Sequence, residues 1–332
     1  RTLRPLATEG CDTVMDRLWQ PVVDALATLE EAIALQRRGE HAAAAARYEA
    51  ILEDRQLPQE VELLIWHNLA AAQRASGRIQ QAIRCYAQAL ACDAEDADSW
   101  NGLGLTLADD GDPLLAVRAH QRAIDIDRCA SGYLCLGNAL RASNQRPRAR
   151  EAFERAWALD PGLAAAQFNL HAAVYDDRAP GEALTALRRA LAIEPAHEQA
   201  QFFDHWIRRW HDLPTSTPAT RAPEFLTSSL DFALEQRDSD TRAFADTFQS
   251  LGYAASLAPR TGDVVELGVR RGTTLRFLAG LWPDRRILGF DSFEGIPEPW
   301  GEQPRGLYST DGDVPSMPSN VTVHPGWFEA TL

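Results

Sequence analysis

The sequence predicts an array of paired α-helices followed by a smaller α/β region with parallel strands. Similar residues recur every 33 or 34 positions in the first two thirds of the chain, as Trp66, Trp100 and Tyr133 illustrate. Further on, an apolar run from Val264 is followed by a glycine turn, a helix-like segment and a second apolar run that ends at Asp291. The period indicates stacked helical repeats, and the strand–turn–helix–strand order indicates a parallel pair of strands.

The composition describes an acidic chain. Its 332 residues carry 47 Asp and Glu against 33 basic residues, all of them arginine, for a formal net charge of −14. Negative charge repels phosphate backbones, so we expect no nucleic-acid partner. No apolar run approaches the roughly 20 residues that span a bilayer, and the first residues lack a secretory apolar core. The five cysteines have no metal-ligand spacing. We therefore expect a cytoplasmic protein with unpaired thiols, no membrane contact and no metal site in these residues.

The repetitive region places small and aromatic residues at fixed offsets. The unit that begins at Trp66 has Ala70, Gly77, Ala82 and Tyr86 at these offsets, and the following units repeat the pattern. Small residues allow two helices to approach closely, the aromatic ring fills the space beside them, and glycine suits the turn between them. Each unit therefore buries its apolar face against a neighbour.

This pattern resembles the tetratricopeptide repeat (TPR), in about five helix–turn–helix copies over residues 25–197. The resemblance implies a superhelix whose concave groove holds a protein or peptide. We expect residues 1–24 to precede the array, 198–211 to form a capping helix and 212–223, rich in Pro and Thr, to be a linker. By the family's register, with a solvated helix face as the alternative for each, the groove residues are His67, Arg74, Asn101, Asn138, Arg141, Phe168 and Tyr175.

Residues 224–332 are expected to form a second domain that opens with two helices. Its first strand leads into the order Glu266-x-Gly268-x-x-x-Gly272. The GxGxxG order of a dinucleotide-binding turn is absent, which disfavours a nicotinamide-dependent oxidoreductase. The pattern instead resembles motif I of class I S-adenosylmethionine-dependent methyltransferases. The longer strings GDVVELGVRRGTTLRFLA and ILGFDSFEGIPEPW resemble the macrocin O-methyltransferase (TylF-like) family.

The resemblance implies a Rossmann-like α/β fold, of which this sequence holds the first three strands, with S-adenosyl-L-methionine as cofactor. Asp291 would accept hydrogen bonds from the ribose hydroxyls, with turn capping as the alternative. Glu266 would face the cofactor's cationic side or hold the glycine turn. Glycines would let the backbone approach the cofactor, and the helix N-terminus would suit its carboxylate. The expected cofactor-binding residues are Glu266, Gly268, Gly272, Thr273, Asp291 and Ser292.

The implied reaction is methyl transfer to an oxygen of a small-molecule acceptor, a sugar or natural-product hydroxyl in bacterial biosynthesis. Similar families use a divalent ion, usually Mg²⁺, whose ligands follow the fourth strand. This sequence stops at Leu332, after the third, so no catalytic residue is assigned. We expect a truncated polypeptide or a missing half supplied from elsewhere. Two hypotheses remain: an O-methyltransferase with a TPR array that recruits a partner or substrate carrier, and a TPR interaction scaffold with an incomplete or inactive cofactor domain.

Overall fold

The computed structural model describes residues 27–53, 57–215, 224–238 and 240–332. These residues form two compact units, which divide between Asp109 and Asp110. The expected segment 1–24, most of the expected linker and Cys11 lie outside the described residues.

The first unit consists of antiparallel helix pairs. Residues 27–37 are helical and are followed by α2 (His41–Leu52), α3 (Gln59–Ala75), α4 (Ile79–Cys92) and α5 (Ala97–Asp109). Small residues allow close packing, as expected: a Cβ added at Gly102 would lie 2.4 Å from the Tyr86 ring. Gly39 and Gly77 occupy the turns inside their helix pairs with φ near +78°, a backbone conformation that glycine adopts at little cost.

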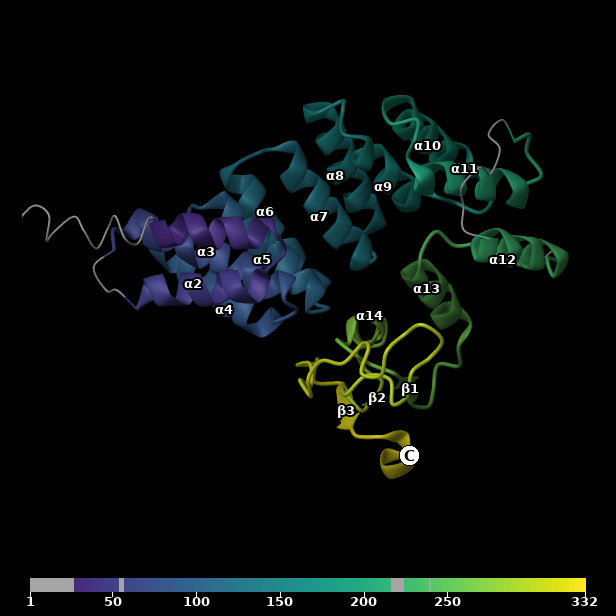
Figure 1. Ribbon diagram of the computed structural model, residues 1–332. Coiled ribbons are helices and arrows are strands. Elements are labelled where there is room, and N and C mark those ends of the chain that lie inside the picture. The colour runs from purple at the N-terminus through teal and green to yellow at the C-terminus, as the bar shows by residue number, and fades with distance from the viewer. Residues whose placement is uncertain (1–26, 54–56, 216–223, 239) are drawn as a thin grey trace, which may run out of the picture. The chain divides into compact units, whose positions relative to one another are not determined.

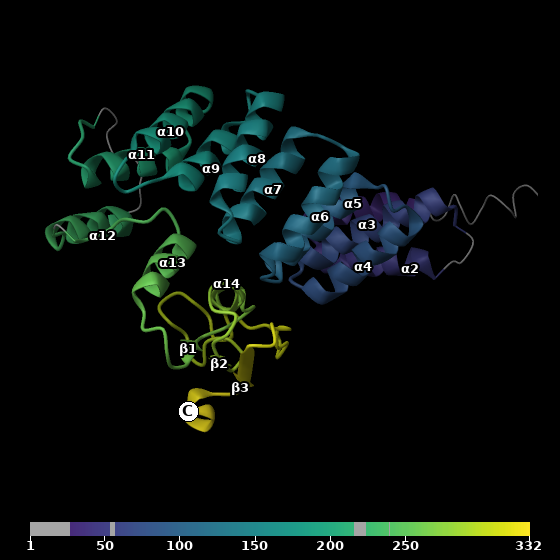
Figure 2. The ribbon, with the colours of Figure 1, turned by 180° about the vertical axis from the view of Figure 1, so that it is seen from behind.

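The second unit continues the helix pairs. Figures 1 and 2 show α7 to α10 lying side by side in order. A Cβ at Gly137 would lie 2.5 Å from the ring of the fully buried Phe153, so this repeat also depends on a missing side chain. The helices of this part are α6 (Pro113–Ile126), α7 (Ala130–Ala142), α8 (Arg146–Leu159), α9 (Ala164–Val174), α10 (Gly181–Ile193) and α11 (Glu198–Trp210).

The helix α11 occupies the segment that we expected to cap the array. It packs on the core of α9 and α10 through Ile207 and Trp210, and Trp206 stacks on Trp210 with ring centroids 5.7 Å apart. Two further helices, α12 (Glu224–Glu235) and α13 (Thr247–Leu257), confirm the prediction of a broken helical segment before the first strand.

The C-terminal residues form a small parallel sheet in the order β1-β2-β3. Its strands are β1 (Val264–Leu267), β2 (Ile287–Asp291) and β3 (Val321–Pro325), with α14 (Thr273–Leu281) between the first two and the short α15 (Phe328–Thr331) at the end. The expectation of three parallel strands is confirmed. The described connection from β2 to β3 contains no helix.

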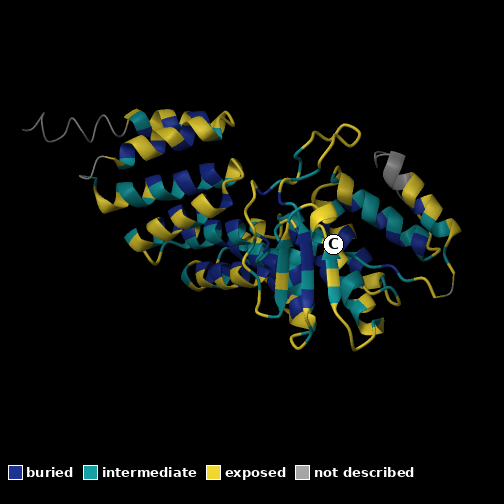
Figure 3. Ribbon diagram, turned by 90° about the horizontal axis from the view of Figure 1, so that it is seen from below, coloured by how far each residue is buried: buried dark blue, intermediate teal, exposed yellow. Residues whose placement is uncertain are grey.

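The helix α14 covers one face of this sheet. Leu275 is fully buried there, and a Cβ at Gly289 would lie 2.5 Å from its side chain. The opposite face is more open, because Val265 and Leu267 remain 54% and 55% exposed. Figure 3 shows the resulting contrast between buried and exposed positions.

The boundary between the two compact units falls inside the expected array, and the expected domain bounds stay a prediction. Within the second unit, the last repeats and the C-terminal segment share polar contacts. Asp246 at the start of α13 pairs with Arg141 of α7, and Gln249 donates to the carbonyl oxygen of Ala172 at the end of α9. Such contacts between segments distant in sequence leave no periodic pattern.

Candidate functional site

A tight turn joins β1 to α14. Gly268 and Gly272 adopt left-handed backbone conformations with φ of +88° and +74°. The N–H of Gly268 donates to the carbonyl oxygen of Phe290, and that of Gly272 to the carbonyl oxygen of Val269. A Cβ built at Gly268 meets no atom within 4 Å. Gly268 therefore opens on to free space beside the end of β2.

Asp291, at the end of β2, fixes the turns on either side of it. One carboxylate oxygen accepts the N–H of Arg270 and the other accepts the N–H of Phe293, both at 2.7 Å. Both donors are non-glycine residues in the left-handed region, with φ of +51° and +61°. That conformation costs roughly 1–2 kcal/mol for each such residue. Hydrogen bonds to a charged acceptor contribute about 1.5–3 kcal/mol each, so the carboxylate offsets the strain.

Glu266 lies beside this turn with one oxygen bonded and one free of partners. Its Oε1 accepts a hydrogen bond from the hydroxyl of Thr274 in the first turn of α14. Its Oε2 is buried and has no hydrogen-bond partner among the described residues. Burial raises the pKa of this carboxyl group above its usual value, and the nearby charge of Asp291 adds to the effect. Thr274 was not among the expected site residues; only its place two residues after Gly272 could have indicated it.

Two predicted roles in the turn need correction. A Cβ at Gly272 would lie 1.7 Å from the methyl group of Met317, so this glycine admits the connection between β2 and β3 rather than leaving open space. Its N–H, expected to face a cofactor carboxylate, is already bonded within the turn. The hydroxyl of Thr273 lies beside Gly111 of the repeat array. Ser292 accepts a hydrogen bond from the N–H of Glu294.

In the first unit, the predicted groove residues already have partners within the repeats. His67 bonds the hydroxyl of Ser99 at 3.0 Å, and Arg74 pairs with Asp109 at 2.6 Å. Asn101 is half-buried. These partners lie one repeat further along the chain, so the side chains link successive helices.

In the second unit, two of the predicted groove residues are packing residues. Tyr175 is 2% exposed, and its hydroxyl contacts Asp177 and His211. Phe168 packs in the same apolar cluster as α11. Tyr175 is therefore too buried to line an open groove, because α11 packs over the final repeat and the family's register does not show this cover. Phe168 is only partly buried, and its groove role stays a prediction. Asn138 is half-buried.

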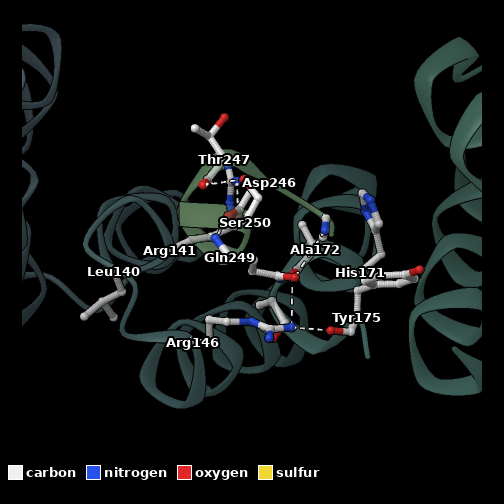
Figure 4. Close-up of polar contacts among 12 residues, drawn as sticks. Leu140, Arg141, Arg146, His171, Ala172, Tyr175, Asp246, Thr247, Gln249 and Ser250 are labelled. Carbon is white, nitrogen blue, oxygen red and sulfur yellow. Dashed lines mark hydrogen bonds and ion pairs between the residues drawn. The ribbon is translucent and has the colours of Figure 1, made fainter. Parts of the chain in front are cut away.

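Arg141 does reach a partner from outside the repeats. Figure 4 shows it beside Asp246, at 3.3 Å, while Gln249 approaches Ala172. In the same view Arg146 donates to the carbonyl oxygens of Ala172 and Tyr175 at the end of α9. The chain's own segment before and within α13 thus contacts the surface predicted for a partner.

The described residues contain no cluster of three or more side chains suited to a metal ion. Among those same residues, no helix combines the length and apolar character that crossing a membrane requires. Cys85, Cys92, Cys129 and Cys135 form no disulfide bonds with one another.

The fold and geometry define a helical-hairpin repeat protein with a small parallel α/β region. Residues 66–111 match the family model described as "TPR repeat". The prediction of TPR repeats is thus confirmed, and the chain carries them. No curated protein matches the chain significantly.

Several solved TPR-like structures are similar to part of the chain. The YrrB structure, described as a TPR protein with an unusual peptide-binding site, is 22% identical and has a TM-score of 0.46; the match covers 58% of this chain and 97% of that one. A MamA structure is 23% identical with a TM-score of 0.41, and the match covers 50% of this chain and 93% of that one. The thermophilic TPR protein TTC0263 of Thermus thermophilus is 18% identical with a TM-score of 0.43, and the match covers 55% of this chain and 98% of that one. The assignment therefore depends on the family match and the helix pairs rather than on these distant likenesses.

Proposed function

We propose that the C-terminal residues bind S-adenosylmethionine at the glycine turn, as part of an O-methyltransferase that acts on a small-molecule hydroxyl. The proposal rests on the buried Oε2 of Glu266, which has no hydrogen-bond partner among the described residues. Two residues further along the chain, a Cβ built on Gly268 meets no atom within 4 Å. A buried carboxylate oxygen without a donor is costly unless a ligand supplies one.

The donor chemistry of the turn fits this cofactor. Glu266 would accept a hydrogen bond from the ammonium group, and the bare backbone at Gly268 would admit the ligand without a steric clash. Asp291 retains a second acceptor position on each oxygen beside its two N–H donors, so it would hold the ribose hydroxyls while still fixing the turn. The cofactor supplies a methyl group on a positively charged sulfur, ready for transfer to an oxygen nucleophile.

Isothermal titration of the 332-residue chain with S-adenosylhomocysteine tests the proposal. Gly268→Ala places a methyl group in the open space and is expected to weaken binding at least about tenfold. Gly262→Ala is the matched control, because Gly262 also has a positive φ of +98°, no neighbour within 4 Å of a built Cβ, and a position outside the turn. Absence of binding to the wild-type chain, or equal binding by the two variants, would contradict the proposal.

The second candidate function is a protein-interaction scaffold. The match of residues 66–111 to the TPR family and the stacked helix pairs favour this function, because such arrays present surfaces for peptides or proteins. In the combined proposal the array recruits a protein partner or substrate carrier for the methyltransferase. If the wild-type chain fails to bind S-adenosylhomocysteine, the scaffold function is the one that remains.

A further inference from the structure

The repeat array touches the glycine turn directly. The turn Asp110–Asp112, immediately before α6, packs against the start of α14. Gly111 has a φ of +78°, and a Cβ built on it would lie 2.6 Å from the hydroxyl oxygen of Thr273 and 2.7 Å from the carbonyl oxygen of Arg271. These distances leave no room for a side chain at Gly111. The contact therefore depends on glycine for space as well as for backbone conformation.

One arginine joins this contact to its surroundings. A terminal nitrogen of Arg276 donates to the carbonyl oxygens of Gly111 and Arg271 at 2.7 and 2.8 Å. The other terminal nitrogen donates to the carbonyl oxygen of Ser316 at 2.9 Å, and Nε lies 3.8 Å from a carboxylate oxygen of Asp112. The Arg276 side chain is only 10% exposed. A single guanidinium thus holds the repeat turn, the glycine turn and the connection between β2 and β3.

A second charged pair lies at the same contact. Arg271 is 3.5 Å from Asp110, and both side chains are less than a quarter exposed. Because Arg271 lies inside the glycine turn, the pair links Asp110 to the backbone segment between Gly268 and α14.

Two other turn glycines of the repeats can be compared with Gly111. Gly39 and Gly77 occupy the equivalent turns of earlier repeats, with φ of +79° and +77°. A Cβ at either position would meet no atom within 4 Å. The three glycines therefore share a backbone conformation, and Gly111 differs in touching the C-terminal segment.

We infer that the repeat turn Asp110–Asp112 positions the glycine turn, so that docking of this repeat turn and ligand binding at the glycine turn are thermodynamically linked. The identity of the ligand rests on the proposed function; the positioning of the turn does not. A ligand that prefers the ordered glycine turn must, by linkage, stabilise its contact with the array. A protein partner that alters the array at this turn would then change the affinity for the cofactor.

The first test compares Gly111→Ala with Gly77→Ala in the full chain. Both variants place alanine in the same strained backbone conformation, but only the first puts a methyl group against Thr273 and Arg271. Gly111→Ala is expected to weaken S-adenosylhomocysteine binding about tenfold, within the usual range of coupling between sites, and Gly77→Ala to leave it unchanged. Equal affinities for the two variants would overturn the linkage.

Hydrogen exchange separates this inference from the proposed function. Amides of residues 269–276 are expected to exchange faster in Gly111→Ala than in Gly77→Ala without any ligand. If the wild-type chain binds no S-adenosylhomocysteine, the proposed function fails, and this comparison still decides the positioning role: equal exchange in the two variants overturns it. If the ligand binds, it should also slow exchange in residues 110–116, because linkage is reciprocal.

A second pair of variants guards against a folding defect in Gly111→Ala. Arg276→Gln removes the guanidinium that joins the three segments. Arg285→Gln is its control, because Arg285 also donates to carbonyl oxygens, those of Gly262 and Pro259, away from the glycine turn. Faster exchange in residues 269–276 for Arg276→Gln alone supports the positioning role. The same exchange in both variants contradicts it.

Discussion

Replacing Asp291 by asparagine tests how the two turns beside β2 are held. The carboxylate accepts the N–H groups of Arg270 and Phe293 through separate oxygens. An asparagine side chain keeps one acceptor oxygen and sets an NH₂ donor against the other N–H. Loss of one hydrogen bond to a charged acceptor costs about 2 kcal/mol. An opening equilibrium shifted by that amount changes about thirtyfold.

Native-state hydrogen exchange of the Arg270 and Phe293 amides measures this opening. Asp263→Asn is the control, because Asp263 pairs with Arg286 on the exposed surface at the other end of the sheet. In the Asp291→Asn background, a second change of Arg270→Gly removes the left-handed cost at that residue and should recover about 1 kcal/mol. Unchanged exchange in Asp291→Asn, or no recovery with glycine, would refute the role given to this carboxylate.

Two other predictions concern the glutamate of the turn and the packing of the repeats. Burial raises the pKa of Glu266, so the folded protein holds its proton more tightly than the unfolded chain, and stability is lost as pH rises through the folded-state value. Glu266→Gln should therefore raise the melting temperature at pH 7, with the gain disappearing in acid, while it weakens S-adenosylhomocysteine binding; a lower melting temperature at pH 7 would contradict this reasoning. Gly137→Ala should lower the free energy of unfolding in urea by about 1–3 kcal/mol through overpacking against the ring of Phe153. Gly181→Ala, where a Cβ meets nothing within 4 Å, should raise it by about 0.5 kcal/mol, and equal effects of the two changes would refute the packing argument.

The repeats and the order of strands could be predicted because their residues recur or alternate along the chain. Gly77 and Gly111 show that contacts between distant segments could not be predicted in this way. They occupy equivalent places in a repeated pattern, yet one faces open space and the other faces Thr273, far along the chain. Nothing local to Gly111 distinguishes the two, because the contact arises from tertiary packing.

The candidate site could likewise be predicted only in part from the sequence. The glycines and the acid at the end of the second strand indicated a turn, and in the structure Asp291 accepts the N–H of Arg270 within that turn. The sequence did not reveal that Arg270 and Phe293 adopt left-handed conformations, since neither is a residue type that favours them. Turn capping, the alternative role that the sequence offered for Asp291, is seen in its two hydrogen bonds, but the residues that it caps became visible only in three dimensions.

Two arginines of the second unit donate to main-chain oxygens. Arg276 reaches the carbonyl groups of Gly111, Arg271 and Ser316, and Arg146 reaches those at the end of α9. Added salt weakens attraction between exposed full charges much more than it weakens short contacts from a buried cation to peptide dipoles. In concentrated salt, the Arg276 contacts between the turn Asp110–Asp112 and the glycine turn should therefore persist, whereas the ion pair Arg141–Asp246 should weaken.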